Sequence, residues 1–158
     1  MSGFSGAAKR WLGSTSNRTF LLWPVLAVLA EALLQQGPPD IDVWALPLLA
    51  LGYLQYRLAG NYRLREGGGG PGVSIPPERL VVGGPYRFCR NPMYLGHLIF
   101  FAGVAFALHS WLAAGVLALH IVWFHRRVLD DEARLAALLG NPYREYCARV
   151  RRWIPGVL

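Results

Sequence analysis

Residues 93–125 read MYLGHLIFFAGVAFALHSWLAAGVLALHIVWFH and contain no Asp, Glu, Lys or Arg. A helix that crosses a bilayer needs about 20 mostly apolar residues, so this block approaches the length of two crossings. Ser110 lies near its middle, where a tight corner can reverse the chain. The block predicts two antiparallel membrane helices, 93–109 and 111–125. The second is short unless the apolar stem of Arg126 or Arg127 extends it to the interface.

Two further apolar blocks, residues 19–36 and 41–59, lie upstream and are separated by the turn sequence Gly37-Pro38-Pro39-Asp40. The chain is 54% hydrophobic and only 16% charged, and its apolar residues form long blocks. This pattern is typical of a membrane protein and not of a soluble domain. The predicted fold class is an all-α, polytopic integral membrane helical bundle. It has about four transmembrane helices in two hairpins, a cytoplasmic loop and C-terminal amphipathic helices.

All 16 Lys and Arg residues fall in an N-terminal arm, a central segment that begins with Arg57, and a C-terminal tail. The turns at 37–40 and 109–110 contain none. Because short cytoplasmic loops are enriched in Lys and Arg, we expect both termini and the central loop in the cytoplasm, and the protein in the inner (plasma) membrane. Basic residues that flank membrane helices contact anionic lipids. Membrane lipids, and no nucleic acid, are therefore the expected partners, while the oligomeric state is not indicated.

These segments make up one membrane domain, residues 1–158. It comprises a cytoplasmic arm (1–18), a first helical hairpin (19–59), a cytoplasmic cofactor loop (60–92), a second hairpin (93–125) and a cytoplasmic helical tail (126–158). In the tail, apolar residues recur at spacings of three and four, and Gly140-Asn141-Pro142 interrupts them. The tail is thus expected to form one or two amphipathic helices.

Three cytoplasmic patterns carry the unusual chemistry. The first is the stretch 84–96, GPYRFCRNPMYLG, whose arginines and helix start favour an anionic group or serve as a basic membrane anchor. The second is the acidic pair Asp131-Glu132 with Arg127 one turn away, which suits a cationic ligand or a solvated helix face. The third places Tyr143 and Tyr146 on one helix face, where they can pack or line a ligand site.

Other titratable residues suggest less. Cys89 and Cys147 lie on the expected reducing side and lack the spacing of a metal site, so neither a disulfide nor a metal is predicted. Glu31 lies within an apolar block near its outer end, where a structural or interfacial role is favoured. No glycine-rich dinucleotide motif follows a strand pattern, which argues against a Rossmann-type cofactor domain.

Taken together, the order and spacing of these motifs from residue 67 to residue 155 resemble the isoprenylcysteine carboxyl methyltransferases, with phospholipid methyltransferases as wider relatives. The resemblance implies a membrane bundle whose cytoplasmic half encloses S-adenosylmethionine, with a lateral opening for a lipid or isoprenoid substrate. It implies Arg127 and Glu132 as catalytic residues. It implies as cofactor-binding residues Glu78, Arg79, Leu80, Val81, Tyr86, Arg90, Asn91, Pro92, Met93, Tyr94, Gly96, Asp131, Tyr143 and Tyr146.

The chain departs from the family pattern at two positions. Asn91 stands where many members have His, and Asp131 replaces the first Glu of the usual acidic pair. The acceptor therefore stays open among a prenylated cysteine carboxylate, a small isoprenoid acid, a thiol and a phospholipid amine. Two other functions also remain: an NADPH-dependent membrane reductase of an isoprenoid or sterol-like substrate, and a non-catalytic lipid-binding membrane protein.

Overall fold

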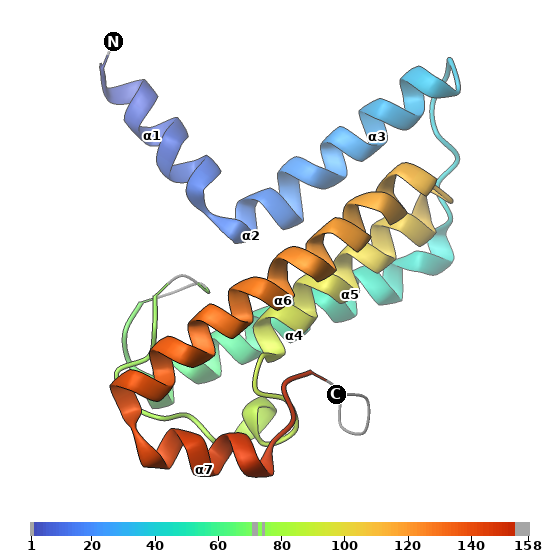
Figure 1. Ribbon diagram of the computed structural model, residues 1–158. Coiled ribbons are helices and arrows are strands. Elements are labelled where there is room, and N and C mark those ends of the chain that lie inside the picture. Colours follow the sequence, from blue (N-terminus) through green and yellow to red (C-terminus); the bar gives the residue numbers. More distant parts are fainter. Residues whose placement is uncertain (1, 71–72, 74, 154–158) are drawn as a thin grey trace.

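A computed structural model of the chain describes residues 2–70, 73 and 75–153. Within these residues the structure is entirely helical, without strands. Figure 1 shows α4, α5 and α6 running alongside one another, with α7 below them and α1 projecting away from the bundle. The elements are α1 (Ser2–Gly13), α2 (Thr15–Asn17), the π-helix η1 (Arg18–Leu22), α3 (Trp23–Leu34), the 3₁₀-helix η2 (Val43–Ala45), α4 (Leu46–Gly67), the 3₁₀-helix η3 (Gly84–Arg87), α5 (Pro92–Ala107), α6 (Trp111–Leu139) and α7 (Asn141–Arg149).

The α5–α6 corner and the end of α6 follow from local sequence. Ser110 caps α6, because its hydroxyl accepts a hydrogen bond from the Ala113 amide at 3.0 Å. At the other end Gly140 adopts a positive φ of 64°, which a glycine tolerates without strain, and α7 begins directly after it. The helix break predicted at Gly140-Asn141-Pro142 is confirmed.

Glycines allow α4 and α5 to pack with their backbones almost in contact. A Cβ atom added to Gly52 would lie 2.4 Å from the Phe100 amide nitrogen, and one added to Gly96 would lie 2.6 Å from that of Tyr56. Only glycine fits such an approach, which is the usual way in which membrane helices gain close packing. Gly96, predicted as a cofactor residue, therefore lies in a helix–helix contact.

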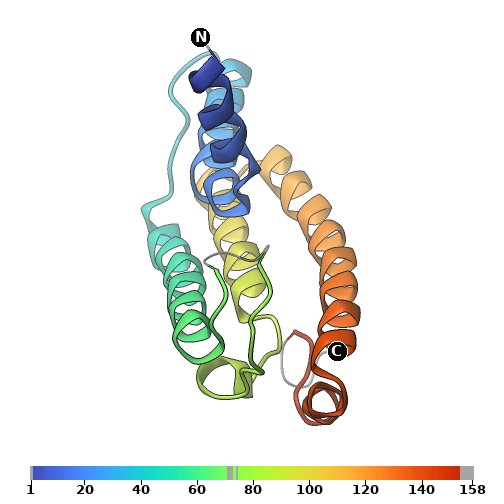
Figure 2. The same ribbon diagram turned by 90° about the vertical axis from the view of Figure 1, so that its left-hand side faces the viewer.

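The helix α3 packs against α5 and α6. In this contact Ala27 is buried in an apolar cluster with Val104 and Ala113. Beyond it the buried Glu31 accepts a hydrogen bond from the Ser110 hydroxyl. Figure 2 shows α4 and α6 on different sides of α5. A polar contact thus ties α3 to the α5–α6 corner.

Two helices extend beyond their expected ends. The helix α4 continues to Gly67, eight residues past the predicted hairpin end at 59, because residues 60–66 contain no proline; Gly68, with a φ of 70°, then ends it. The helix α6 likewise continues from 125 to Leu139 as a single element. Residues 15–34 and 111–139 form helices long and apolar enough to cross a membrane, whereas the apolar α5 is shorter. The count of four spans stays a prediction.

Candidate functional site

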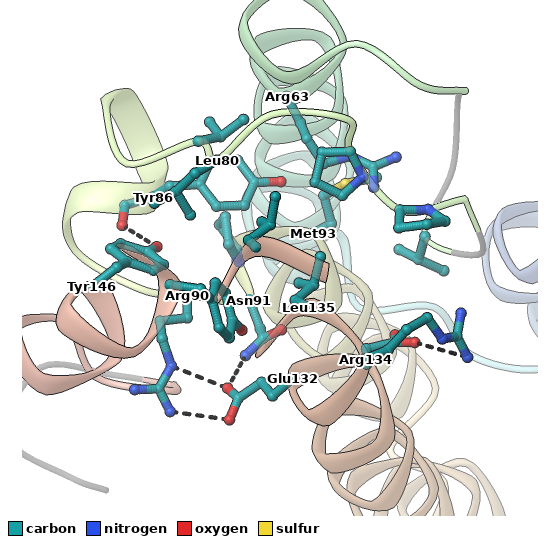
Figure 3. Close-up of a pocket in the computed structure, with 18 of the residues that line it drawn as sticks. Arg63, Leu80, Tyr86, Arg90, Asn91, Met93, Glu132, Arg134, Leu135 and Tyr146 are labelled. Atoms are coloured by element: carbon teal, nitrogen blue, oxygen red, sulfur yellow. Dashed lines mark hydrogen bonds and ion pairs between the residues drawn. The ribbon is translucent and has the colours of Figure 1, made fainter. Parts of the chain in front are cut away.

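A cavity, partly open to solvent, lies where α4, α5, α6 and α7 meet residues 73 and 75–86 (Figure 3). Its walls combine aliphatic side chains, tyrosines, carboxylates and arginines. They are formed by Arg63, Val73, Pro76, Pro77, Leu80, Val81, Tyr86, Arg90, Asn91, Pro92, Met93, Tyr94, Asp131, Glu132, Arg134, Leu135, Leu139, Tyr143 and Tyr146.

Glu132 connects three parts of the chain at the floor of the cavity. Its carboxylate accepts hydrogen bonds from Arg90 Nε at 3.0 Å and Nη2 at 3.2 Å, and from Asn91 Nδ2 at 3.2 Å. It also accepts from Arg152 Nε at 3.1 Å and Nη2 at 3.0 Å. The Glu132 and Arg90 side chains are 12% and 10% exposed. Two guanidinium groups thus neutralise this carboxylate within the protein.

The neighbouring acid, Asp131, has a different environment. Its Oδ2 accepts a hydrogen bond from the Tyr94 hydroxyl at 2.7 Å, and the same hydroxyl accepts from Arg127 Nε at 2.8 Å. The nearest guanidinium atoms, Arg127 Nε and Arg134 Nη2, lie 4.0 and 3.9 Å from Asp131 carboxylate oxygens. Asp131 therefore keeps more capacity than Glu132 to bind a cationic group in the cavity.

Buried tyrosines form the wall between η3 and α7. The Tyr146 hydroxyl donates a hydrogen bond to the Tyr86 carbonyl oxygen at 2.6 Å, which joins the two segments. Burial raises the pKa of Tyr86, of Tyr143 and of Tyr146 above the usual range for a phenol. Their hydroxyls stay protonated at neutral pH, so this wall is uncharged and can contact a flat, apolar ligand group.

Cys89 and Arg90 attach the C-terminal residues to the start of α5. The Arg90 amide donates to the Arg151 carbonyl at 2.9 Å, and the Cys89 thiol donates to the Arg152 carbonyl at 3.5 Å. Burial raises the pKa of the Cys89 thiol to about 11. Because only a thiolate is a good nucleophile, this cysteine is suited to packing and not to covalent catalysis.

Arg63 was not predicted, although it lines the cavity. It is buried on α4, and its guanidinium donates to the Ile75 carbonyl at 2.7 Å and to the Gly70 carbonyl at 2.9 Å. It thereby holds the segment after α4 against the site. Residue 63 falls in the predicted loop 60–92, whereas the structure places it on α4, and helical periodicity then directs it to the cavity.

Most of the predicted site residues lie together in this cavity. Those that line it are Leu80, Val81, Tyr86, Arg90, Asn91, Pro92, Met93, Tyr94, Asp131, Glu132, Tyr143 and Tyr146. Four predicted residues do not line the cavity. Gly96 packs on α4, and Arg127 donates a hydrogen bond to the Tyr94 hydroxyl. The backbone amides of Glu78 and Arg79 donate to the Gly67 carbonyl. The roles assigned to all of them stay predictions.

Other lining residues were not predicted from the sequence. Besides Arg63 they are Val73, Pro76, Pro77, Arg134, Leu135 and Leu139. Leu135 and Leu139 follow Asp131 at intervals of four, so their shared helix face was a usable signal. Among the described residues, no group of three or more His, Cys, Asp and Glu side chains could hold a metal ion.

Comparison with known proteins supports the resemblance seen in the motifs. The sequence pattern of the phospholipid methyltransferase family matches residues 43–137. The protein-S-isoprenylcysteine O-methyltransferase of Schizosaccharomyces pombe is 31% identical over 78 residues, covering 48% of this chain and 33% of that protein. Protein-S-isoprenylcysteine O-methyltransferase B of Arabidopsis thaliana is 35% identical over 82 residues, covering 51% and 41%.

The longest of the reported matches is to the cobalt-zinc-cadmium resistance protein CzcN of Cupriavidus metallidurans, which is 31% identical over 139 residues. That match covers 85% of this chain and 62% of CzcN, so the chain spans less than two thirds of each of these relatives. The family pattern nevertheless covers more than half of the chain and both helices that carry the acidic pair and the Asn91-Pro92-Met93-Tyr94 motif. The chain therefore belongs to the phospholipid methyltransferase family of membrane methyltransferases and is similar to its isoprenylcysteine O-methyltransferases.

Proposed function

We propose that the chain is an S-adenosylmethionine-dependent methyltransferase that methylates the carboxylate of an isoprenoid or lipid-like acceptor at the cytoplasmic membrane face. The observation that carries the proposal is the convergence of the family's motif residues on one cavity, with Asp131 beside arginines and tyrosines. In keeping with the distribution of Lys and Arg, we place four spans in the inner membrane and both termini in the cytoplasm. Green fluorescent protein fused to the C-terminus fluoresces only when it folds in the cytoplasm, so its fluorescence tests the proposed location of the C-terminus.

The cavity walls fit the chemical parts of S-adenosylmethionine. Asp131 suits its ammonium group, while Arg63 or Arg134 suits its carboxylate. Leu80, Tyr86 and neighbouring apolar side chains suit the adenine ring. Glu132 fits less well as a direct ligand because two arginines and Asn91 already bind its oxygens. We therefore propose that Glu132 acts on the site by holding Arg90 and Asn91 in position.

The residues also favour an acceptor that arrives ionised. When bound, S-adenosylmethionine would supply a methyl group from its sulfonium sulfur to an acceptor oxygen, and the electron pair of the carbon–sulfur bond would stay on sulfur. A carboxylate needs no proton removal, whereas a protonated amine needs a base. No histidine is among the described residues that line the cavity. This difference favours the carboxylate over a phospholipid amine.

Binding of S-adenosylhomocysteine to the purified chain in detergent tests the proposal. A ligand at 100 times its dissociation constant stabilises a folded protein by about 2.7 kcal/mol, which a thermal shift detects. Asp131→Asn removes a charge from the cavity and should weaken binding by at least about tenfold. The matched control is Asp130→Asn, at the adjacent exposed position, which should bind normally.

Two outcomes of this experiment would contradict the proposal. Stabilisation by NADPH without stabilisation by S-adenosylhomocysteine would indicate a reductase. Stabilisation by neither would indicate a non-catalytic protein. If the cofactor analogue binds, incubation with radiolabelled S-adenosylmethionine and a lipid extract identifies the acceptor. Label that resists base would then argue against a methyl ester and for methylation of nitrogen or sulfur.

A further inference from the structure

The chain meets the start of α5 again after α7, in residues 150–153, which we call the C-terminal strap. Backbone carbonyls of the strap accept hydrogen bonds from Arg90: that of Val150 from Nη1 at 2.9 Å, and that of Arg151 from the amide at 2.9 Å. Farther on, Trp153 packs against the apolar cluster that α5 and α6 share. Because Arg90 lines the cavity, the strap lies directly behind one of its walls.

Arg152 connects the strap to two residues of the cavity wall. Its Nε and Nη2 atoms donate to Glu132 Oε2 at 3.1 and 3.0 Å, and its carbonyl accepts from Asn91 Nδ2 at 3.2 Å. Asn91 Nδ2 also donates to Glu132 Oε1 at 3.2 Å, so the three residues form a closed set of bonds. Glu132 and Asn91 line the cavity, whereas Arg152 is not among the described residues that do.

The oxygens of the Glu132 carboxylate have different partners. Oε1 accepts from Arg90 and Asn91, which approach it together in Figure 3. Oε2 accepts from Arg90 Nη2 and from both Arg152 nitrogens. The side chains of Arg152 and Glu132 are 30% and 12% exposed, so water screens this ion pair only in part. Charge-assisted hydrogen bonds are roughly twice as strong as neutral ones, and here they fix the orientation of the carboxylate.

The orientation of Arg90 depends on the same carboxylate. Its Nη1 donates to the carbonyls of Cys147 and Val150 at 2.8 and 2.9 Å, while its Nε and Nη2 bind Glu132. Rotation of the Glu132 carboxylate would therefore disturb the bonds of Arg90 and of Asn91 at once. Because both residues line the cavity, the arrangement that a ligand meets depends on a residue outside the cavity.

We propose that Arg152 is a positioning residue of this site, which holds the Glu132 carboxylate and thereby orders Arg90 and Asn91 before a ligand binds. Side chains that are ordered in advance lose less conformational entropy in the binding step, so the affinity for the ligand is higher. Arg152 acts through Glu132 and not by contact with the ligand. This inference rests on the proposed function, which it extends to a residue outside the cavity.

Titration calorimetry of the full chain in detergent with S-adenosylhomocysteine tests the role of Arg152. Arg152→Gln removes the charge and should raise the dissociation constant by about tenfold, whereas Arg152→Lys retains the charge and should raise it less. The matched control is Arg149→Gln, the same change at an exposed position near the end of α7, which should bind like the wild-type chain. An unchanged dissociation constant in Arg152→Gln would overturn the inference.

A double-mutant cycle shows whether Arg152 acts through Glu132. In the Glu132→Gln background there is no carboxylate for Arg152 to hold, so adding Arg152→Gln should change the dissociation constant by less than about twofold. Losses of affinity that multiply would show an independent effect and would overturn the inference. Should Glu132→Gln fail to fold, the comparison of Arg152→Lys with Arg152→Gln decides, and equal losses in these two would overturn the inference.

Stability and wild-type binding separate the remaining explanations. A merely structural role would lower the free energy of unfolding of Arg152→Gln without ligand, while the folded fraction binds with wild-type affinity; this result would overturn the inference. If the wild-type chain does not bind S-adenosylhomocysteine, the proposed function fails, and the inference fails with it. If the wild-type chain binds and Arg152→Gln binds equally well, only the inference about Arg152 fails.

Discussion

Two parts of α5, a polar part at its start (residues 90–94) and an apolar part beyond it (residues 96–107), are held in place by different interactions. At its start, Arg90, Asn91 and Tyr94 bond to the acidic pair on α6 through charged groups and hydrogen bonds. Further along, Gly96 and Gly103 pack closely against α4, which is possible because glycine has no side chain. The start of α5 thus depends on the chemistry of residues 90–94, and the part from Gly96 onward on how little space its glycines occupy.

The largest effect is expected at the polar part. Glu132→Ala leaves the largely buried Arg90 guanidinium without its carboxylate, and breaking a buried ion pair typically costs about 3–5 kcal/mol. Unfolding in mixed dodecylmaltoside–SDS micelles measures the free energy of unfolding of each variant. The control, Glu145→Ala at an exposed position of α7, should change it by less than about 0.5 kcal/mol. Equal effects of the two substitutions would show that Glu132 has no special role in stability.

The apolar part should respond to added volume. In Gly96→Ala the new methyl group would lie 2.6 Å from the Tyr56 amide nitrogen, so α4 and α5 must separate, at a cost of about 1–3 kcal/mol. Gly115→Ala makes the same change on α6, where nothing lies within 4 Å. It should stabilise the helix by up to about 1 kcal/mol. The same unfolding assay compares them, and a stabilising Gly96→Ala would contradict the close packing.

The smallest effect is expected at the contact between α3 and the α5–α6 corner. Glu31→Gln retains a hydrogen-bond acceptor for Ser110 but removes the charge, so about 0.5–1.5 kcal/mol of stability should be lost. Asp40→Asn, the same change at an exposed position of the nearby turn, is the control. If Glu31→Gln proves as harmful as Glu132→Ala, the polar contact at this end is as important as the charged network, and the contrast between the two parts fails.

Local patterns sufficed to predict the second hairpin and the break at Gly140. The family resemblance of the motif 84–96 and of the acidic pair named most of the residues that line the cavity. The family match over residues 43–137 supports that resemblance. The end of α4 was not predicted. The apolar block ends at residue 59, and the residues between it and the glycine run were assigned to the loop. Residues 60–66 in fact continue the helix and carry Arg63 to the site.

Two features depend on tertiary contacts that no local pattern indicates. Arg152 is one of many tail arginines, and only the folded chain shows that it bonds to Glu132, twenty residues away in sequence. The apolar depression lined by Leu26, Phe101 and Leu112 likewise arises from the spacing between helices that are each simply apolar. In both cases the sequence contains the right residue types, but their pairing depends on geometry that develops only when distant segments meet.

The bond between Arg152 and Glu132 also has a consequence for biogenesis. Translation delivers Glu132 to the ribosome exit before Arg152, so helix insertion into the bilayer can start while the acid lacks this partner. Glu132, which lines the cavity, gains this partner only after residues 150–152 have emerged and bonded to the residues just before α5. A nascent chain arrested before this segment would be inserted in the membrane, yet its Glu132 would lack the hydrogen bonds from Arg152.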